Sequence, residues 1–277
     1  MIRLSAFADE ISPDLNEQVA VLLDENIHSI DFRSAWNTNV LDLSDEQVEK
    51  VRHTLDTHGI TIAAIGSPLG KVPVDIDFDE HFRHFERAIT LANFFNTRYI
   101  RLFSFYPPLS NDAGWPAAYR DEVISHLRRM TERAAAENLI LLHENEKGIY
   151  GDSIARNVDL LQSVNDAHLR AVLDPANYLQ CEQVPYPDAY EAVRPWLAYV
   201  HVKDVRPDGT LAVAGEGSAR WPDLLQRLRA DGYDGFLALE PHLAAAGQYQ
   251  GFSGPQLFRQ ASQALQRLLH DMNWEYA

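Results

Sequence analysis

Cysteine is almost missing from this sequence. The 277 residues include only one, Cys181, so an internal disulfide is excluded. The chain also lacks a positively charged start followed by an apolar stretch and a cleavage site before Ala6, the pattern of a secretory signal. Both absences favour a reducing compartment, and we therefore expect a cytoplasmic protein.

Long apolar runs and an excess of positive charge are missing as well. No run approaches the roughly 18 consecutive apolar residues of a membrane-spanning helix. The 24 basic residues are outnumbered by 40 acidic ones, and the formal charge of −16 disfavours contact with nucleic acid or an anionic membrane. Because no linker or repeat divides the chain, we expect one domain over residues 1–277 that binds a small molecule.

Short apolar runs alternate with longer stretches of helical spacing along the whole chain. The expected strands begin at Ile2, His28, Thr61, Arg98, Leu139, Leu169, Ala198 and Gly235. Helices are expected over residues 14–26, 44–59, 80–95, 119–137 and 221–232. Several helices begin at a Ser or Asp cap and one ends at a Gly. Eight strand-helix units predict an α/β fold, a single (β/α)₈ barrel, with a doubly wound sheet as the alternative.

Four late strands each end in a residue type that binds metals. These residues are Glu144, Asp174, His201 and Glu240, with separations of 30, 27 and 39 residues. In a barrel the carboxyl ends of consecutive strands meet at one mouth, so the four side chains are expected to converge. Three carboxylates and one imidazole suit a divalent ion such as Mn²⁺, Mg²⁺, Co²⁺ or Zn²⁺. A helix cap or a solvated loop position is the structural alternative for each residue taken alone.

Side chains alternate along a strand, and this predicts which neighbours of the four residues face the barrel mouth. Glu146 shares a side with Glu144, Lys203 with His201 and His242 with Glu240, so these neighbours are expected to face the substrate. His143 points between strands unless the chain has already turned. Asn177 follows Asp174 by three residues, after Pro175 ends the strand.

Further polar residues stand near the expected strand ends. Glu10 closes the first strand and is expected to face the mouth or to cap a helix. Lys71, Arg101 and Arg206 are candidates for binding an anionic group or hydroxyls of the substrate, and a simple loop charge is the alternative for Lys71. An unpaired buried guanidinium would be expensive, which favours an orienting contact for Arg101.

At these residues the sequence resembles the sugar phosphate isomerase/epimerase family, the xylose isomerase-like barrels of the AP endonuclease family 2 superfamily. The resemblance covers nearly the whole chain. It is carried by "FADEIS", "GSPLGK", "LLHENEKG", "VLDPANY", "YVHVKDV", "GEGSARWPDLL" and "GYDGFLALEPH".

The resemblance implies that Glu144, Asp174, His201 and Glu240 bind one divalent ion, with Mn²⁺ favoured, and that the protein forms a homo-oligomer. Glu144 is favoured over Glu146 as the first ligand. Asn177 departs from the family, since many relatives carry His at that position; this concerns substrate contacts rather than the metal.

The expected activity is isomerisation or epimerisation of a ketose, an aldose or a related sugar, phosphorylated or not, through a metal-stabilised enediolate. The resemblance implies that Glu144 and Glu240 move the proton, and Lys203 and His242 are free to polarise a hydroxyl. The alternative is a lyase that eliminates an aglycone from a 3-oxo sugar, for which His143 offers a further acid or base. An endonuclease IV-like phosphodiesterase, opposed by the charge, and a non-catalytic sugar-binding barrel complete the alternatives.

Overall fold

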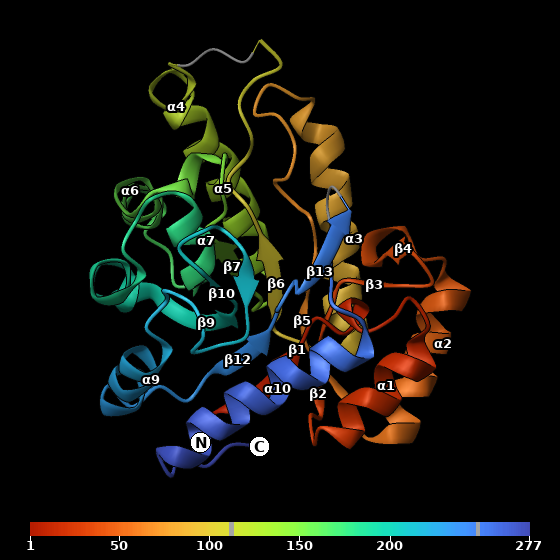
Figure 1. Cartoon of the computed structure of the whole chain (residues 1–277). Coiled ribbons are helices and arrows are strands. Elements are labelled where there is room, and N and C mark those ends of the chain that lie inside the picture. The colour runs from red at the N-terminus through yellow and green to blue at the C-terminus, as the bar shows by residue number, and fades with distance from the viewer. Residues whose placement is uncertain (111–113, 248–249) are drawn as a thin grey trace.

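Eight parallel strands close into a barrel, which confirms the predicted (β/α)₈ fold (Figure 1). The computed structural model describes residues 1–110, 114–247 and 250–277. The barrel strands are β1 (Arg3–Ala6), β2 (Ser29–Phe32), β5 (Thr61–Ile65), β6 (Tyr99–Leu102), β7 (Ile140–Glu144), β8 (Leu169–Leu173), β9 (Leu197–Val202) and β12 (Phe236–Leu239). Seven lie within the predicted runs and β9 begins one residue before its run, at Leu197. β1 pairs with both β2 and β12 to close the barrel.

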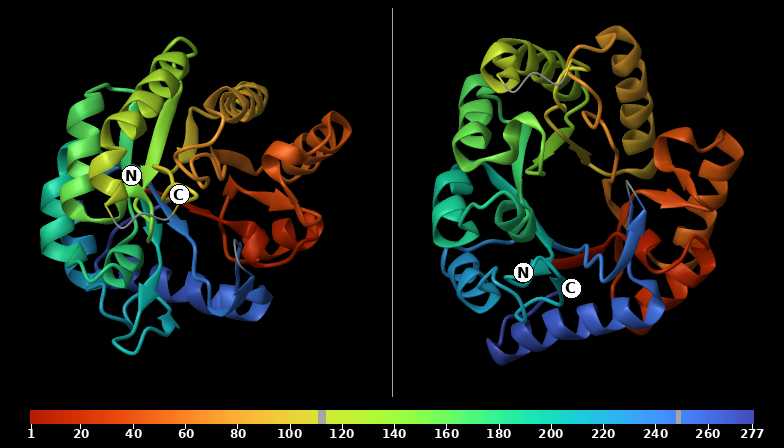
Figure 2. Two further views of the ribbon diagram at one scale, coloured as in Figure 1. Left: turned by 90° about the horizontal axis from the view of Figure 1, so that it is seen from above. Right: turned by 45° about the horizontal axis from the view of Figure 1, so that its top comes forward.

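Helices surround the strands in a ring, as Figure 2 shows. They are α1 (Leu15–Asp24), α2 (Asp45–His58), α3 (Phe78–Phe95), α4 (Trp115–Ala118), α5 (Arg120–Ala135), α6 (Ile154–Val164), α7 (Pro175–Gln180), α8 (Tyr190–Val193), α9 (Trp221–Ala230) and α10 (Gly254–Asp271). The five predicted helices correspond to α1, α2, α3, α5 and α9. The predicted caps are present: Ser44 and Gln47 form a capping box before α2, and Gly59 ends that helix at φ 67°.

The inside of the barrel is filled by side chains and is not a channel. Its apolar layer is formed by Phe7, Ala63, Ala64, Leu142, Val172, Tyr199, Phe236 and Ala238. Below the mouth, the Tyr199 hydroxyl lies 2.9 Å from Oδ1 of Asp31, whose other oxygen accepts from Ser5. Burial raises the pKa of Asp31. These polar groups bond one another, as buried polar groups must.

Short irregular elements form the rim at the carboxyl ends of the strands. Two-stranded hairpins follow β2, β9 and β12: β3–β4 (Ser34–Ala35, Thr38–Asn39), β10–β11 (Asp204–Val205, Leu211–Ala212) and β13–β14 (Ala244–Gly247, Gln250–Phe252). Asp204 in β10 holds the "GEGSAR" loop in place. Its carboxylate accepts hydrogen bonds from the N–H groups of Gly215, Gly217 and Ala219. The loop is therefore a turn whose N–H groups are occupied by a carboxylate of the protein itself.

The chain ends lie at the opposite, amino end of the strands (Figure 1), where Ile2 bridges Tyr276. Among the residues that the structure describes, no helix has both the length and the apolar composition needed to cross a membrane.

Gly70 tests how tightly the rim is packed against the barrel. It has φ +82°, and a Cβ atom there would lie 2.0 Å from the Phe103 carbonyl oxygen. Gly70→Ala should therefore lower the free energy of unfolding by roughly 3 kcal/mol. Gly209→Ala is the matched control, because Gly209 has φ +86° but no heavy atom near its Cβ position, and should cost about 1 kcal/mol. Equal urea midpoints for the two variants would contradict this account.

Candidate metal centre at the barrel mouth

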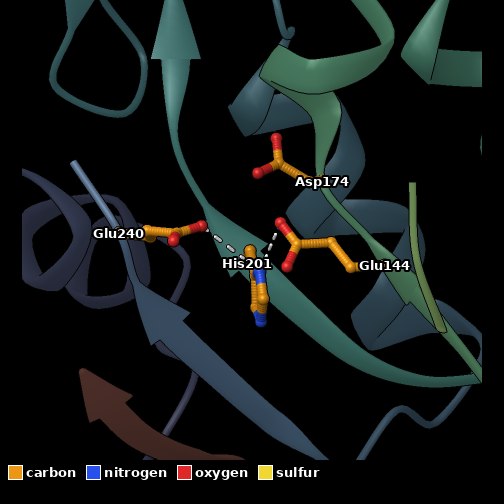
Figure 3. Close-up of side chains that lie close together, drawn as sticks. All are labelled: Glu144, Asp174, His201 and Glu240. Carbon is orange, nitrogen blue, oxygen red and sulfur yellow. Dashed lines mark ion pairs between the residues drawn. The ribbon is translucent and has the colours of Figure 1, made fainter. Parts of the chain in front are cut away.

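The four residues that the spacing selected converge at the mouth (Figure 3). Glu144 ends β7, Asp174 follows β8, His201 lies in β9 and Glu240 follows β12. Each offers a ligand atom, and these atoms all lie within 4.8 Å of one another. None of the four residues is more than 3% exposed. Figure 3 shows Glu144 and Glu240 on opposite sides of His201.

Strand alternation explains the convergence. Two residues before each member of the cluster stands an interior residue of the barrel: Leu142, Val172, Tyr199 and Ala238 respectively. The four polar side chains therefore form the next interior layer above the apolar one.

The donor atoms of this cluster fit a divalent cation. His201 Nδ1 lies 3.2 Å from Glu144 Oε1 and 3.4 Å from Glu240 Oε2. Among the described residues, His201 Nδ1, Asp174 Oδ2 and Glu240 Oε2 are buried and make no hydrogen bond of acceptable geometry, although charged groups lie nearby. Buried polar atoms without hydrogen bonds call for a further partner, and an oxygen and nitrogen set of this kind could hold a metal ion.

The protonation states of Glu144 and His201 depend on each other. Burial alone would raise the pKa of Glu144, but the charges of His201 and Arg101 outweigh it and lower that pKa to about 2. Burial would likewise lower the pKa of His201, but Glu144 and Glu240 raise it to about 10. Without a metal, His201 is therefore a cation between two carboxylates.

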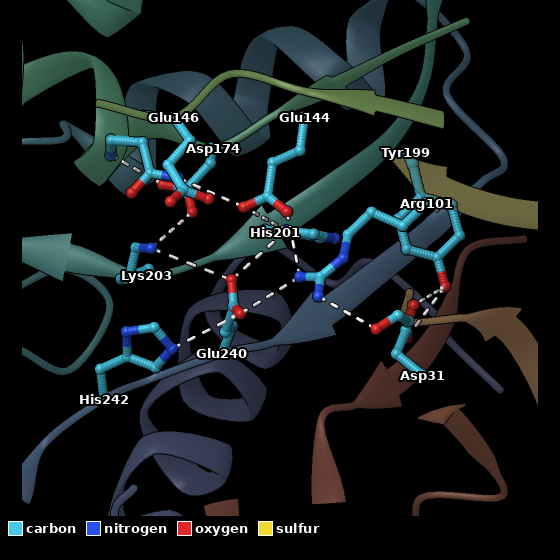
Figure 4. A network of polar contacts seen from close by, with 12 residues as sticks. Asp31, Arg101, Glu144, Glu146, Asp174, Tyr199, His201, Lys203, Glu240 and His242 are labelled. Atoms are coloured by element: carbon cyan, nitrogen blue, oxygen red, sulfur yellow. Dashed lines mark hydrogen bonds and ion pairs between the residues drawn. The ribbon is translucent and has the colours of Figure 1, made fainter. Parts of the chain in front are cut away.

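Lys203 lies between two carboxylates of the cluster, as Figure 4 shows. Its Nζ is 2.9 Å from Asp174 Oδ2 and 3.9 Å from Glu240 Oε2. Burial opposes its charge, but these carboxylates raise the pKa of Lys203. Burial raises the pKa of Asp174 in spite of Lys203. The prediction that Lys203 faces the same side as His201 is consistent with these contacts.

Two arginines neutralise the outer oxygens of the glutamates. Arg101 Nη1 lies 3.0 Å from Glu144 Oε2 and 3.5 Å from Glu240 Oε1. Arg33 Nη1 lies 2.9 Å from Glu240 Oε1, and its Nε donates to Asp9 Oδ2 at 2.7 Å. Arg33 and Asp9 were not predicted from the sequence as site residues. Arg33 directly follows β2, so the strand-end rule applied to the early strands would have found it.

Asn177 and Asn145 hold the carboxylates from the side. Asn177 Nδ2 donates to Glu144 Oε1 at 3.2 Å, and Asp174 Oδ1 accepts from the Asn177 N–H at 2.9 Å. The Asn145 side chain exchanges two hydrogen bonds with the Asp174 backbone. Asp174 is therefore the N-cap of α7 with one oxygen, while its other oxygen faces the cluster.

Glu10 and His242 extend the site on the side of Glu240. Glu10 Oε2 accepts from the His242 N–H and from Ser253 Oγ, at 2.8 and 2.9 Å. His242 Nε2 lies 3.1 Å from Glu10 Oε1 and 3.4 Å from Glu240 Oε1. Burial raises the pKa of Glu10 against the charges of His242 and Arg33. Glu10 and His242 thus reach the mouth, as the sequence predicted.

Glu146 and Lys71 pair at the rim instead of joining the four. Lys71 Nζ lies 2.6 Å from Glu146 Oε2, and the Tyr106 hydroxyl donates to Glu146 Oε1 at 3.0 Å. The structure therefore places Glu144, and not Glu146, within reach of Asp174 and His201.

Two predicted residues are not brought to the cluster. His143 alternates with Glu144 and packs outside the barrel wall, where a Cβ atom on Gly151 would lie 2.6 Å from His143 Cε1; burial lowers the pKa of His143 to about 4. Arg206 belongs to the β10–β11 hairpin, where it pairs with Glu216 at 2.9 Å and is 42% exposed. The geometry gives neither residue a contact with the candidate metal ligands.

Comparison with known proteins places this geometry in context. Residues 20–268 match the family model described as xylose isomerase-like TIM barrel. The chain is 24% identical to the 3-dehydroshikimate dehydratase of Bacillus anthracis over 226 residues, 74% of this chain and 78% of that protein.

Several solved structures share the fold, among them two with a bound ligand. D-psicose 3-epimerase with D-tagatose from Clostridium cellulolyticum H10 has a TM-score of 0.74 at 14% identity, covering 97% of this chain and 99% of that chain. A xylose isomerase-like TIM barrel protein from Mycobacterium smegmatis, in complex with magnesium, has a TM-score of 0.73 at 17% identity, covering 98% of this chain and 97% of that chain.

Substitution of the cluster should remove metal binding. We expect Glu144→Gln, Asp174→Asn, His201→Ala and Glu240→Gln each to lower the Mn²⁺ content, measured by plasma emission spectrometry after dialysis, by at least about tenfold, because each removes one of few ligands. Glu137→Gln, at an exposed position in the turn after α5, is the control and should keep its metal. Full metal content in all four variants would place the ion elsewhere.

Metal affinity should rise with pH. Only the neutral imidazole of His201 can bind an ion, and the pKa of His201 is about 10 without metal. The imidazole must therefore lose a proton on binding at any lower pH, so the association constant should rise about tenfold per pH unit between pH 7 and 9. Calorimetry in buffers of different ionisation enthalpy should detect about one released proton per ion. A pH-independent affinity would contradict the protonated state of His201.

Proposed function

The chain belongs to the xylose isomerase-like TIM barrel family, and from this premise we propose that it is a divalent-metal-dependent sugar isomerase or epimerase. The observation that carries the proposal is the buried set of three carboxylates and one imidazole at the strand ends, with two glutamates on opposite sides of His201 (Figure 3). Glu144, Asp174, His201 and Glu240 would hold the ion, most suitably Mn²⁺ or Mg²⁺ for an oxygen-rich site.

The ion would supply Lewis acidity to a carbonyl and a neighbouring hydroxyl oxygen, which lowers the energy of the enediolate. Glu144 and Glu240 then take a proton from the carbon next to the carbonyl and return it. Because they face each other across the cluster, one can remove the proton from one face while the other delivers it to the opposite face. That division of labour inverts a stereocentre. Delivery of the proton to the carbonyl carbon instead isomerises the sugar, provided that the hydroxyl proton passes to the former carbonyl oxygen.

Cations around the glutamates assist this transfer. Arg101 and Arg33 hold the outer oxygens of Glu144 and Glu240, so each carboxylate keeps one oriented oxygen toward the cluster. Lys203, which pairs with Asp174, and His242, which lies next to Glu240, would donate to substrate hydroxyls. In a water-poor site such fixed donors stabilise developing negative charge more strongly than solvent does.

Elimination is the second candidate, and a specific observation supports it. The chain shares 24% identity over 226 residues with a protein named 3-dehydroshikimate dehydratase, and a dehydratase is a lyase. Loss of water or of an aglycone β to the carbonyl would begin with the same proton removal. His143, on which the sequence argument for a lyase relied, lies outside the barrel wall, so the acid for this reaction would have to be another residue, such as Lys203 or His242.

The remaining alternatives have less support. The candidate cluster contains one histidine and the formal charge is −16, which disfavours a nuclease of the endonuclease IV kind. A non-catalytic sugar-binding barrel would use Glu144 and Glu240 only to hold the ion. The single domain, the cytoplasmic location and a homo-oligomer stay predictions from the sequence.

Proton exchange in heavy water tests the proposed function. Mn²⁺-loaded protein incubated with ketoses, aldoses, 3-oxo-glycosides and 3-dehydroshikimate should introduce deuterium next to a carbonyl, detected by NMR and mass spectrometry. Glu144→Gln and Glu240→Gln should each lower exchange by about 10² to 10⁴, whereas Glu137→Gln should not change it.

The products separate the candidates. An isomer of equal mass apart from deuterium indicates isomerisation or epimerisation, and loss of water or of an aglycone indicates a lyase. Tight sugar binding without exchange by metal-saturated protein would refute both enzymatic proposals.

A further inference from the structure

A pocket of about 360 Å³ lies beside the candidate metal centre, and three of its lining residues are cations. Arg33, Arg101 and Lys71 line it together, while Asp42 is its one acidic lining residue among those described and is exposed. Arg33 and Arg101 also contact the glutamates of the cluster. The pocket and the candidate metal centre therefore share these two arginines.

Two phenyl rings hold these cations in a row. Arg33 and Arg101 lie over the Phe7 ring, at 4.8 and 4.6 Å from its centroid. Arg101 and Lys71 lie over the Phe103 ring, at 5.0 and 4.3 Å. Cation–π contacts keep each side chain oriented, so three like charges are fixed next to one another in a chain that is strongly acidic as a whole.

The guanidinium groups retain unused donors. Arg33 Nη2 and Arg101 Nε are buried and have no hydrogen-bond partner among the described residues, and the two side chains are only 6% and 5% exposed. An orphaned buried donor costs free energy unless a ligand completes it. Lys71 has a carboxylate partner, Glu146, on the rim.

We propose that this cationic pocket, formed by Arg33, Arg101 and Lys71, binds an oxyanion of the substrate, either a carboxylate or a phosphate. The inference rests on the proposed function for the other end of the substrate, where the carbonyl meets the metal centre. Arg33 Nη2 and Arg101 Nε can each donate to an oxyanion, and Lys71 adds a point charge. The substrate class is therefore a sugar acid, a hydroxy-keto acid or a sugar phosphate rather than a neutral sugar.

Binding of simple probes tests this pocket separately from catalysis. Calorimetry on the full chain, metal-depleted and again Mn²⁺-loaded, should detect binding of D-glucuronate or inorganic phosphate but not of neutral xylitol at the same concentration. Added KCl should weaken the binding. The tighter of the two anions identifies a carboxylate or a phosphate as the natural group.

Three variants of the rim separate a binding role from a structural one. Lys71→Met should weaken anion binding by about tenfold or more, and Glu146→Gln should strengthen it, because Lys71 loses its competing carboxylate. A merely structural ion pair would weaken binding in both variants. Lys147→Met, an exposed lysine next to Glu146, is the matched control and should bind the anions like the unchanged protein.

Equal binding of xylitol and the anions, no anion binding in either metal state, or equal effects of Lys71→Met and Lys147→Met would overturn the proposal. Deuterium exchange into a neutral sugar with no anion binding would refute the cationic pocket and leave the proposed function intact. Anion binding without deuterium exchange into any substrate would refute the proposed function and leave the cationic pocket intact.

Discussion

Electrostatic repulsion among three buried carboxylates is the constraint to which the mouth of this barrel responds. Glu144, Asp174 and Glu240 offer oxygens within 4.8 Å of one another and of His201, away from the water that would screen them. Buried like charges are tolerated only when cations and hydrogen bonds offset the loss of hydration. Protonated His201 and the buried Lys203, together with the two arginines, supply those cations in the absence of a metal.

These cations also orient the carboxylates of Glu144 and Glu240. The outer oxygens of the two glutamates face arginines, and their inner oxygens face His201. The same arginines also line the cationic pocket and lie over the Phe7 ring. Isomerisation and elimination both begin with removal of a proton next to a carbonyl, so one arrangement serves either reaction. The leaving group on the substrate, and the donor that meets it, decide between them.

Individual residues show how far the sequence could be interpreted. The alternation of side chains along a strand predicted that Lys203 and His242 would reach the mouth, because the rule needs only local geometry. The same rule could not decide the direction of the His143 side chain, because the end of the strand was uncertain. The structure places that ring against Gly151. The position of Arg206 could not be predicted for a related reason: the hairpin after β9 brings it to Glu216, and hairpin paths are not encoded in strand periodicity.

The sequence by itself determined the eight strand-helix units, the barrel class and the four strand-end residues of the cluster, because hydrophobic period and spacing along the chain suffice for these. Only the tertiary structure decided which cations neutralise which carboxylates. Arg33 meets Glu240 although 207 positions separate them, and Phe7 and Phe103 align three cations from different strands and loops. Contacts of this kind arise from closure of the barrel, which sets distances that no local pattern contains.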